Sequence, residues 1–176
     1  MADNSIEQLK AKVNLRGGFV RTNQYKIFMP TIPGASIDAA TLNILCTRVQ
    51  MPGRQIMTNE RKVGLETAKA AYGYTNVEVN ISFRETAQYD VRKYFQAWQN
   101  LGVDPLTNRI GYLRGTEGYG KQVRIIQLDK NDNTLHTVEL REAYPTTLNS
   151  IDLAATDEGT LVETNVSLSY TKWVDL

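Results

Sequence analysis

Residues 76–85, with the sequence NVEVNISFRE, alternate between apolar and polar side chains. Val77, Val79, Ile81 and Phe83 occupy every second position. A period of two with one apolar face is typical of a strand that is buried on one side. The intervening polar residues are therefore expected to share the opposite face: Glu78, Asn80, Ser82 and Arg84.

The segment that follows, residues 86–101, has the period of a helix. Its apolar and aromatic residues recur at spacings of three and four: Val91, Tyr94, Phe95, Trp98 and Leu101. Thr86 is placed to cap the start of this helix, and Gly102 stands where a glycine often ends one. We expect the aromatic stripe to pack against a sheet.

Further strands are predicted on both sides of this pair. Two precede it, in GFVRTNQYKIFMP and in LNILCTRVQ, and a hairpin follows it, with KQVRIIQL and TLHTVELR joined by the turn residues DKNDN. AYPTT is predicted to be a turn, followed by irregular turns with a short strand over SIDLA. The last strand, VETNVSLSYTKWV, directs Val166, Leu168 and Tyr170 to one face, and Trp173 anchors its end.

Six to eight strands and one helix predict a mainly β fold, a two-sheet antiparallel β-sandwich or barrel with one flanking α-helix. The 176 residues are expected to form a single domain, 1–176. Residues 1–17 are interpreted as an N-terminal arm or frayed helix. Residues 54–75 have mixed charges, many small residues and no clean alternation, which predicts a long extended loop; such loops are often functional.

Composition narrows the classes of function. The formal net charge is +1, whereas a protein that binds phosphates usually has a basic excess. Cys46 lies between apolar residues, which favours a small core residue. The N-terminal sequence has no apolar core of a secretory signal, and no apolar run approaches the roughly 18 residues that span a bilayer. We expect a soluble protein that is made in a cytoplasm.

Three candidate sites do not match the chemistry they resemble. GTEGYGKQ lacks the Ser or Thr that follows the lysine of a phosphate-binding loop, and the segment after it is rich in β-formers. DKNDN lacks the glycine and the distant glutamate of a calcium loop. His136, the one histidine, alternates with Val138 and Leu140 and has no second histidine to form a metal pair. The prediction is therefore no enzyme, no metal and no cofactor.

Several segments occur in an order that resembles the tail tube proteins of contractile-tailed bacteriophages. They are MPGRQI, NVEVNISFRET followed by VRKYFQAW, IIQLDKNDNTLHTVELREAYPTTLNSIDL, and LVETNVSLSYTKW. The resemblance covers roughly residues 18–174, and its most specific pieces are AYPT and SYTKW.

The resemblance implies the fold shared with the tube protein of type VI secretion systems. It also implies six-subunit rings in which strands of neighbouring subunits pair, and which stack into a tube that conducts DNA into the host after sheath contraction. The implied partners are other copies of the chain, the tail sheath protein, baseplate and tail-terminator proteins, the tape measure protein in the lumen, and DNA in transit. The implied location is the virion, after assembly in the host cytoplasm.

In this family the segment corresponding to residues 54–75 lies at contacts between rings. The expected inter-ring residues are Glu60, Arg61, Lys62, Glu66, Lys69 and Tyr72. The polar face of residues 76–85 is a candidate for the lumen or for a subunit interface: Glu78, Asn80, Ser82 and Arg84.

Other readings remain open at this level. The same fold serves the tube of a phage-derived injection machine, the tube of a type VI secretion machine, or a baseplate tube initiator. A binding module for a small ligand or for single-stranded nucleic acid would be a monomer, and for nucleic acid would cluster aromatics with cations; the nine tyrosines are instead spread along the chain. An enzyme would require His136 or a carboxylate pair to be essential.

Overall fold

The longest strand, β9 (Thr134–Leu148), belongs to two sheets at once in the computed structural model, which describes residues 6–154 and 159–176. Its first part pairs with β8 (Lys121–Leu128) and β11 (Lys172–Asp175). Its last part, Tyr144 to Leu148, pairs with β10 (Glu163–Ser169). Glu142, with φ of 55°, lies near the end of the first part, one residue before Ala143, which is the last residue that pairs with β8.

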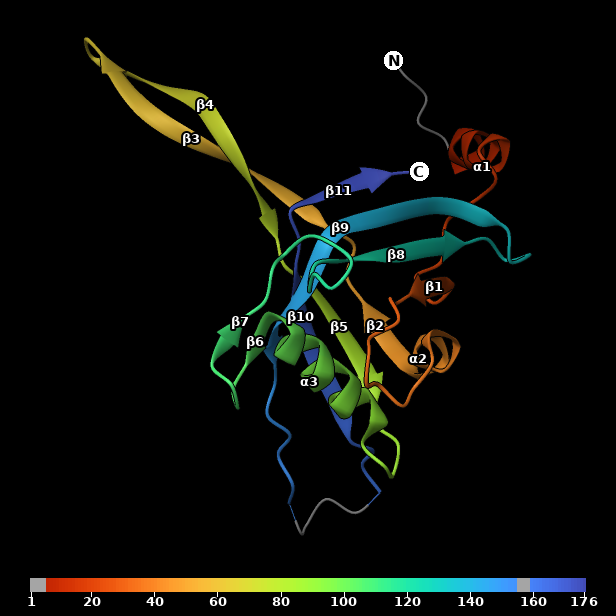
Figure 1. The fold of residues 1–176 in the computed structure, drawn as a ribbon. Coiled ribbons are helices and arrows are strands. Elements are labelled where there is room, and N and C mark those ends of the chain that lie inside the picture. Colours follow the sequence, from red (N-terminus) through yellow and green to blue (C-terminus); the bar gives the residue numbers. More distant parts are fainter. Residues whose placement is uncertain (1–5, 155–158) are drawn as a thin grey trace.

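The two sheets are antiparallel throughout (Figure 1). Sheet A has the order β1 (Tyr25–Phe28), β8, β9, β11. Sheet B has the order β9, β10, β5 (Val79–Arg84), β2 (Cys46–Val49). The predicted two-sheet antiparallel fold with a flanking helix is confirmed.

The predicted turn at AYPTT is wrong, because β9 continues through it. Pro145 pairs with Leu168 next to a register shift at Ser167 and Leu168. Proline has no N–H to donate and is tolerated in strands at edges and bulges, so the residues that suggested a turn mark an irregular edge instead. The closing strand is divided into β10 and β11, which lie in different sheets. SIDLA forms no strand in residues 150–154, and residues 155–158 lie outside the described residues.

The core lies between sheet A, sheet B and the helix α3 (Asp90–Gly102). Val79, Ile81 and Phe83 of β5 are buried, as alternation predicted, and Val166, Leu168 and Tyr170 are buried beside them. Four aromatic residues stack and meet edge to face at centroid distances of 5.1 to 6.3 Å: Phe83, Tyr94, Phe95 and Trp98. Such pairs add to the hydrophobic contribution of the rings.

Helix α3 begins four residues later than predicted. The backbone N–H of Asp90 reaches the hydroxyl of Thr86 at 3.4 Å, but the residue before the helix is Tyr89, in the left-handed conformation. Two side chains of α3 bond to carbonyls of other segments: Trp98 Nε1 donates to the carbonyl of Tyr119 at 2.7 Å, and the Tyr94 hydroxyl donates to the carbonyl of Pro30. Burial raises the pKa of Tyr94. These bonds allow the polar ends of two core aromatics to be buried.

The described residues contain three helices where the sequence predicted one. α1 (Ile6–Leu15) lies in the predicted N-terminal arm and has no buried residue. α2 (Ala39–Leu45) occupies the first half of the second predicted strand; Asp38 caps it, and Asn43 Oδ1 accepts a hydrogen bond from the N–H of Ile27 at 2.7 Å. Cys46, directly after α2, is only partly buried, and burial raises the pKa of its thiol to about 11.

The predicted long loop is also wrong, because residues 54–75 lie in a hairpin. β3 (Gly53–Val63) and β4 (Glu66–Val77) pair along their whole length, with one register shift between Met57 and Thr58. Alternation was absent from the sequence because neither face of this hairpin is buried against a core. Val77, expected beside Val79, ends β4 and is half exposed. A second short hairpin, β6 (Val103–Asp104) and β7 (Arg109–Ile110), follows α3.

We expect Phe95→Ala to destabilise the fold by about 3–5 kcal/mol, the range for removing a buried Phe. Phe95 is fully buried and contacts three other rings. Chemical denaturation followed by circular dichroism measures the change. Gln96→Ala, at the neighbouring exposed position of the same helix, is the control and should change stability by less than about 0.5 kcal/mol. Equal effects of the two variants would contradict the placement of the core.

Candidate assembly interfaces

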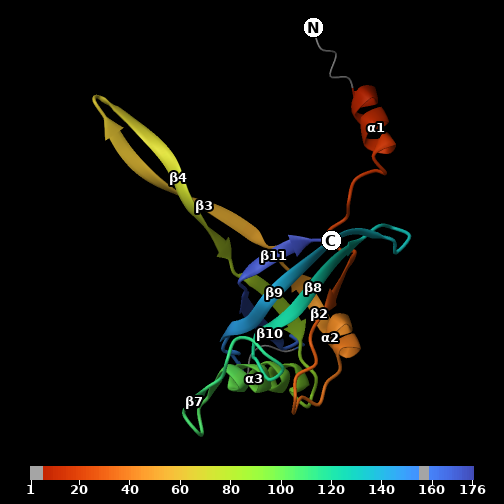
Figure 2. The same cartoon turned by 45° about the horizontal axis from the view of Figure 1, so that its top comes forward.

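The hairpin of β3 and β4, here called the arm, extends away from both sheets (Figure 2). Every side chain of β4 except Asn76 is exposed. The exposed side chains include large apolar and aromatic ones: Ile56, Leu65, Tyr72 and Tyr74. A two-stranded hairpin with both faces in water is marginally stable by itself. The arm thus presents a surface suited to a contact outside its own chain.

The six residues predicted for inter-ring contacts all lie on the arm. Glu60 and Lys69 are directly opposite and form an ion pair of 3.1 Å, with both side chains more than half exposed. Exposed pairs of this kind contribute little to stability. By alternation Lys62 shares their face, whereas Arg61 and Glu66 belong to the opposite face. Tyr72 lies at the register shift. The arm therefore carries charges on both faces.

The base of the arm is held by the end of the chain. The guanidinium of Arg54 lies 4.8 Å from the ring centre of Tyr74 and 5.1 Å from that of Trp173. The hydroxyl of Tyr170 donates to the carbonyl of Val77 at 2.7 Å. Burial raises the pKa of Tyr170, and Arg54 opposes the shift. Sequence reasoning missed these contacts because Tyr170 and Val77 are 93 residues apart.

The polar face predicted on residues 76–85 is present and is wider than one strand. Ser82 Oγ donates to Asn165 Oδ1 at 2.6 Å, and Ser167 Oγ donates to Asn80 Oδ1 at 2.7 Å. Asn80 also donates to Gln50 at 3.0 Å. Glu78 accepts from Thr146, and Arg84 lies opposite Glu163. The outer face of sheet B thus has a centre of small neutral polar groups that bond to one another, with charged residues around it.

Sheet B has two free edges within the described residues. β2 pairs only with β5, and the Tyr144 to Leu148 part of β9 pairs only with β10. Because each strand of the sheet is antiparallel to the next, β2 and β9 run in opposite directions. Free edges expose unpaired backbone donors and acceptors, which are templates for pairing with another chain.

The outer face of sheet A differs in its chemistry. Glu139 points outward from β9 and is buried beneath Arg124 and Arg141, whose Nε atoms donate to it at 2.9 and 3.0 Å. Burial alone raises the pKa of Glu139, but the two arginines outweigh it and hold the pKa below its usual value. Register places Lys26 and Lys172 on the same face. Four cations and one anion make this face basic.

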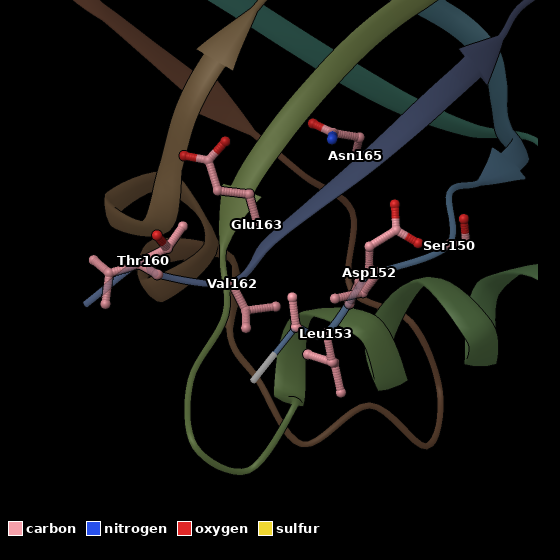
Figure 3. A pocket seen from close by; sticks show the side chains of 10 residues that line it. Ser150, Asp152, Leu153, Thr160, Val162, Glu163 and Asn165 are labelled. Atoms are coloured by element: carbon pink, nitrogen blue, oxygen red, sulfur yellow. The ribbon is translucent and has the colours of Figure 1, made fainter. Parts of the chain in front are cut away.

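One groove lies between residues 150–154 and residues 160–165 (Figure 3). It encloses about 510 Å³ and contains the carboxylates of Asp152 and Glu163. Its described lining has no histidine, cysteine or lysine that would activate a nucleophile or assist a carboxylate. The described residues of the groove thus form no assembled catalytic group.

His136 and the remaining titratable residues do not form a catalytic or metal site in the described part of the chain. His136 Nε2 lies 3.4 Å from Asp175 Oδ1, and both side chains are about half exposed. His136 shares the face of β9 that carries Val138 and Leu140, but its side chain lies outside the core. Over residues 6–154 and 159–176, three or more metal-binding side chains nowhere gather at one point. The DKNDN segment is a hairpin turn closed by the Asp129 N–H and the Asn133 carbonyl.

None of the helices within these ranges has the length and apolar character needed to cross a membrane.

The comparisons agree with this arrangement of sheets and arm. The family model described as phage tail tube protein matches residues 20–176, so the chain belongs to the phage tail tube protein family. The resemblance noted in the sequence is confirmed. A search among curated proteins found no match. The family is one of structural tube proteins, which confirms that the chain is not an enzyme.

Several solved structures share the fold at low sequence identity. One is the PVC sheath–tube complex of an extracellular contractile injection system in the extended state, with a TM-score of 0.59, 14% identity, and coverage of 99% of this chain and 99% of that chain. Another is the PVC sheath/tube terminator, with a TM-score of 0.63, 13% identity, and coverage of 90% of this chain and 96% of that chain. A third is the baseplate of the anti-feeding prophage, with a TM-score of 0.62, 13% identity, and coverage of 90% of this chain and 95% of that chain.

Glu139→Gln is expected to lower the free energy of unfolding at pH 7 by about 1–3 kcal/mol, because two charged hydrogen bonds are weakened. The pKa of Glu139 is lower in the folded state, so its stabilisation is present above the unfolded value of about 4.5 and is lost as the pH falls through the folded value. Urea denaturation at pH 7 and pH 3 should show a smaller difference between the two proteins in acid. A difference that is equal at both pH values would contradict the charge-based role.

Proposed function

We propose that this chain is the subunit of a phage tail tube, in which rings of six copies stack into a hollow tube that conducts DNA into the host after sheath contraction. The observation that carries the proposal is sheet B, which has two free edges of opposite direction, in a chain of the tail tube family. The number six comes from the resemblance to the tail tube family.

Ring closure follows from the polarity of sheet B. When the free edge of β9 in one copy meets the free edge of β2 in the next, the new pair is antiparallel, like every pair inside the sheet. The contact is head-to-tail, so it repeats around a ring if its rotation closes. A closed ring leaves no free edge in this sheet. Because each copy contributes an even number of strands to this sheet, namely four, neighbouring strands alternate in direction around the whole ring.

Stacking of rings is assigned to the arm. At about 3.3 Å per residue, the 11 residues of β3 extend about 36 Å, which is long enough to reach a neighbouring ring. The exposed Ile56, Tyr72 and Tyr74 supply apolar surface, and charges on both faces supply complementary contacts. Glu60, Arg61, Lys62, Glu66 and Lys69 remain our proposed inter-ring residues with Tyr72.

The lumen is assigned to the polar face of sheet B. DNA in transit should meet few cations, because each phosphate contact adds affinity. On this face Glu78 and Glu163 balance Arg48 and Arg84, and the centre consists of Ser, Asn and Gln side chains. The basic face of sheet A is less suited to DNA passage. We therefore assign Glu78, Asn80, Ser82 and Arg84 to the lumen and sheet A to the outside, toward the sheath.

The same proposal includes the partners of such a tube. These are the tail sheath protein around it, baseplate and tail-terminator proteins at its ends, and the tape measure protein in its lumen. Assembly takes place in the host cytoplasm and the product is part of the virion. No cofactor is involved.

A second candidate is the tube of a phage-derived contractile injection machine, a type VI secretion tube or a baseplate tube initiator. The observation that favours the first of these is the fold shared with PVC and anti-feeding prophage structures. Electron microscopy of particles from the producing cells distinguishes them, because a phage tail is attached to a DNA-filled head and an injection machine has none.

We expect the purified protein to form six-fold rings, and tubes of uniform width as its concentration rises, because free edges pair by mass action. Negative-stain electron microscopy with class averaging measures the symmetry. A chain that stays monomeric at high concentration, both alone and with baseplate present, would contradict the proposal.

Shortening the arm should separate ring formation from stacking. Asn59 and Ala70 are directly paired, so residues 60–69 can be replaced by Asn-Gly, which favours a two-residue hairpin turn. We expect this variant to form rings that do not stack. The control places Asn-Gly at residues 64–65, between the paired Val63 and Glu66, and should form tubes. Tubes of ordinary length from the shortened variant would refute the assignment of stacking to the arm.

A further inference from the structure

An apolar groove lies beside the free edge of β9. It encloses about 390 Å³ between the C-terminal end of α3, the β6–β7 hairpin and the end of β9. Its lining is rich in aromatic and apolar side chains: Trp98, Val103, Ile110, Tyr119, Tyr144 and Pro145. The rings of Tyr119 and Tyr144 meet edge to face at 5.1 Å.

Gly102 lies against the ring of Tyr119 at the end of α3. A Cβ at this position would lie 3.4 Å from that ring, at van der Waals contact. Gly111, on the other side, approaches the carbonyl of Leu101 so closely that a Cβ would overlap with it. The backbone itself therefore shapes the groove, and Val103 and Ile110 at its rim are largely exposed.

The groove and the free edge share residues. Tyr144, Pro145 and Thr146 line the groove and also belong to the part of β9 that has only one partner strand. Pro145 is level with Leu168, and Leu168 is level with Val79. Leu168 and Val79 are fully buried, so this row of sheet B faces the layer that contains α3. A strand added at the edge would extend the same row.

The residue that continues this row is Met51, two positions after the end of β2. Val49 pairs with Ile81, and the N–H of Gln50 donates to the carbonyl of Asn80 at 3.0 Å. Met51 is next and is level with Val79, on the same side as Val49 by the period of two. The side chain of Met51 is 41% exposed. In a single chain this row of sheet B therefore ends at Met51 on the β2 edge and at the apolar groove on the β9 edge.

We propose that, in the ring, Met51 of one subunit occupies the groove beside Pro145 of the next subunit. The inference rests on the ring contact proposed above and adds the side chain that sets its register. A thioether adapts to irregular apolar space and makes favourable contacts with aromatic rings, which Trp98, Tyr119 and Tyr144 supply. Pairing with β5 fixes the face of Met51. A slip of the new pair by two residues would keep that face but move Met51 by about 7 Å along the edge, away from Pro145, so the groove selects one register.

The test uses two variants that are mixed before assembly, both with Cys46→Ser. One carries Met51→Cys and the other carries Gln99→Cys, which lines the groove from α3. Bismaleimidoethane should join the two chains in assembled rings, and mass spectrometry of the peptides should identify the 51–99 link. The matched control replaces Met51→Cys by Ile44→Cys, a more exposed position at 79%, and should give no link to residue 99.

Each outcome decides the question. Rings that form without the 51–99 link, or that link residue 44 in its place, overturn the inference and leave the ring proposal standing. A link from Leu9→Cys of the exposed helix α1 to residue 99, in place of residue 51, also overturns it. If no rings form, the ring proposal fails and this inference fails with it.

Oxidation with hydrogen peroxide supplies an independent measurement without cysteine variants. Met51 and Met57 are equally exposed in the single chain, each at 41%, so they should oxidise at similar rates in monomers. In unstacked rings of the shortened-arm variant, which retains both residues, Met51 should oxidise at least fivefold more slowly while Met57 is unchanged. Equal rates for the two residues in rings would overturn the inference.

Discussion

The rest of this structure depends on the backbone hydrogen bonds of β9, because one strand of 15 residues must find partners along both of its edges. β8 and β11 satisfy its first part, and β10 satisfies one edge of its last part. The change of partner, next to the left-handed Glu142, joins the two sheets around one core. It also leaves one edge of sheet B unpaired, and this edge is the basis for the proposed ring.

The two outer faces of the sandwich have different chemistry although they enclose the same core. The centre of the outer face of sheet B consists of neutral side chains that bond to one another, so it offers few unsatisfied groups to a passing polymer. Sheet A carries Arg124 and Arg141 over a buried Glu139, which leaves a net positive surface. The described residues contain no assembled catalytic group. The features available for assembly are this contrast between the two faces, the free edges of sheet B and the arm.

The arm shows how a chain can hold a structure that has little stability of its own. Arg54, Tyr170 and Trp173 fix its base to the end of the chain, while the rest has both faces in water. Asn76 Oδ1 and Trp173 Nε1, near this base, are buried without a hydrogen-bond partner among the described residues. Unpaired buried groups are costly, so the base is a place where further contacts would be favourable.

The sequence by itself determined the features that depend on local period. The alternation from Val79 to Phe83 and the helical stripe from Val91 to Trp98 predicted a buried face, and both are buried, whereas Val77 at the start of the same pattern is exposed. Only the tertiary structure decided where β9 ends, that residues 53–77 form a paired arm, and that Ala39–Leu45 is helical. Those outcomes depend on partners far away in the chain, such as Leu168 for Pro145. In the arm both faces are exposed, so backbone pairing imposes no alternation of apolar and polar residues on its sequence.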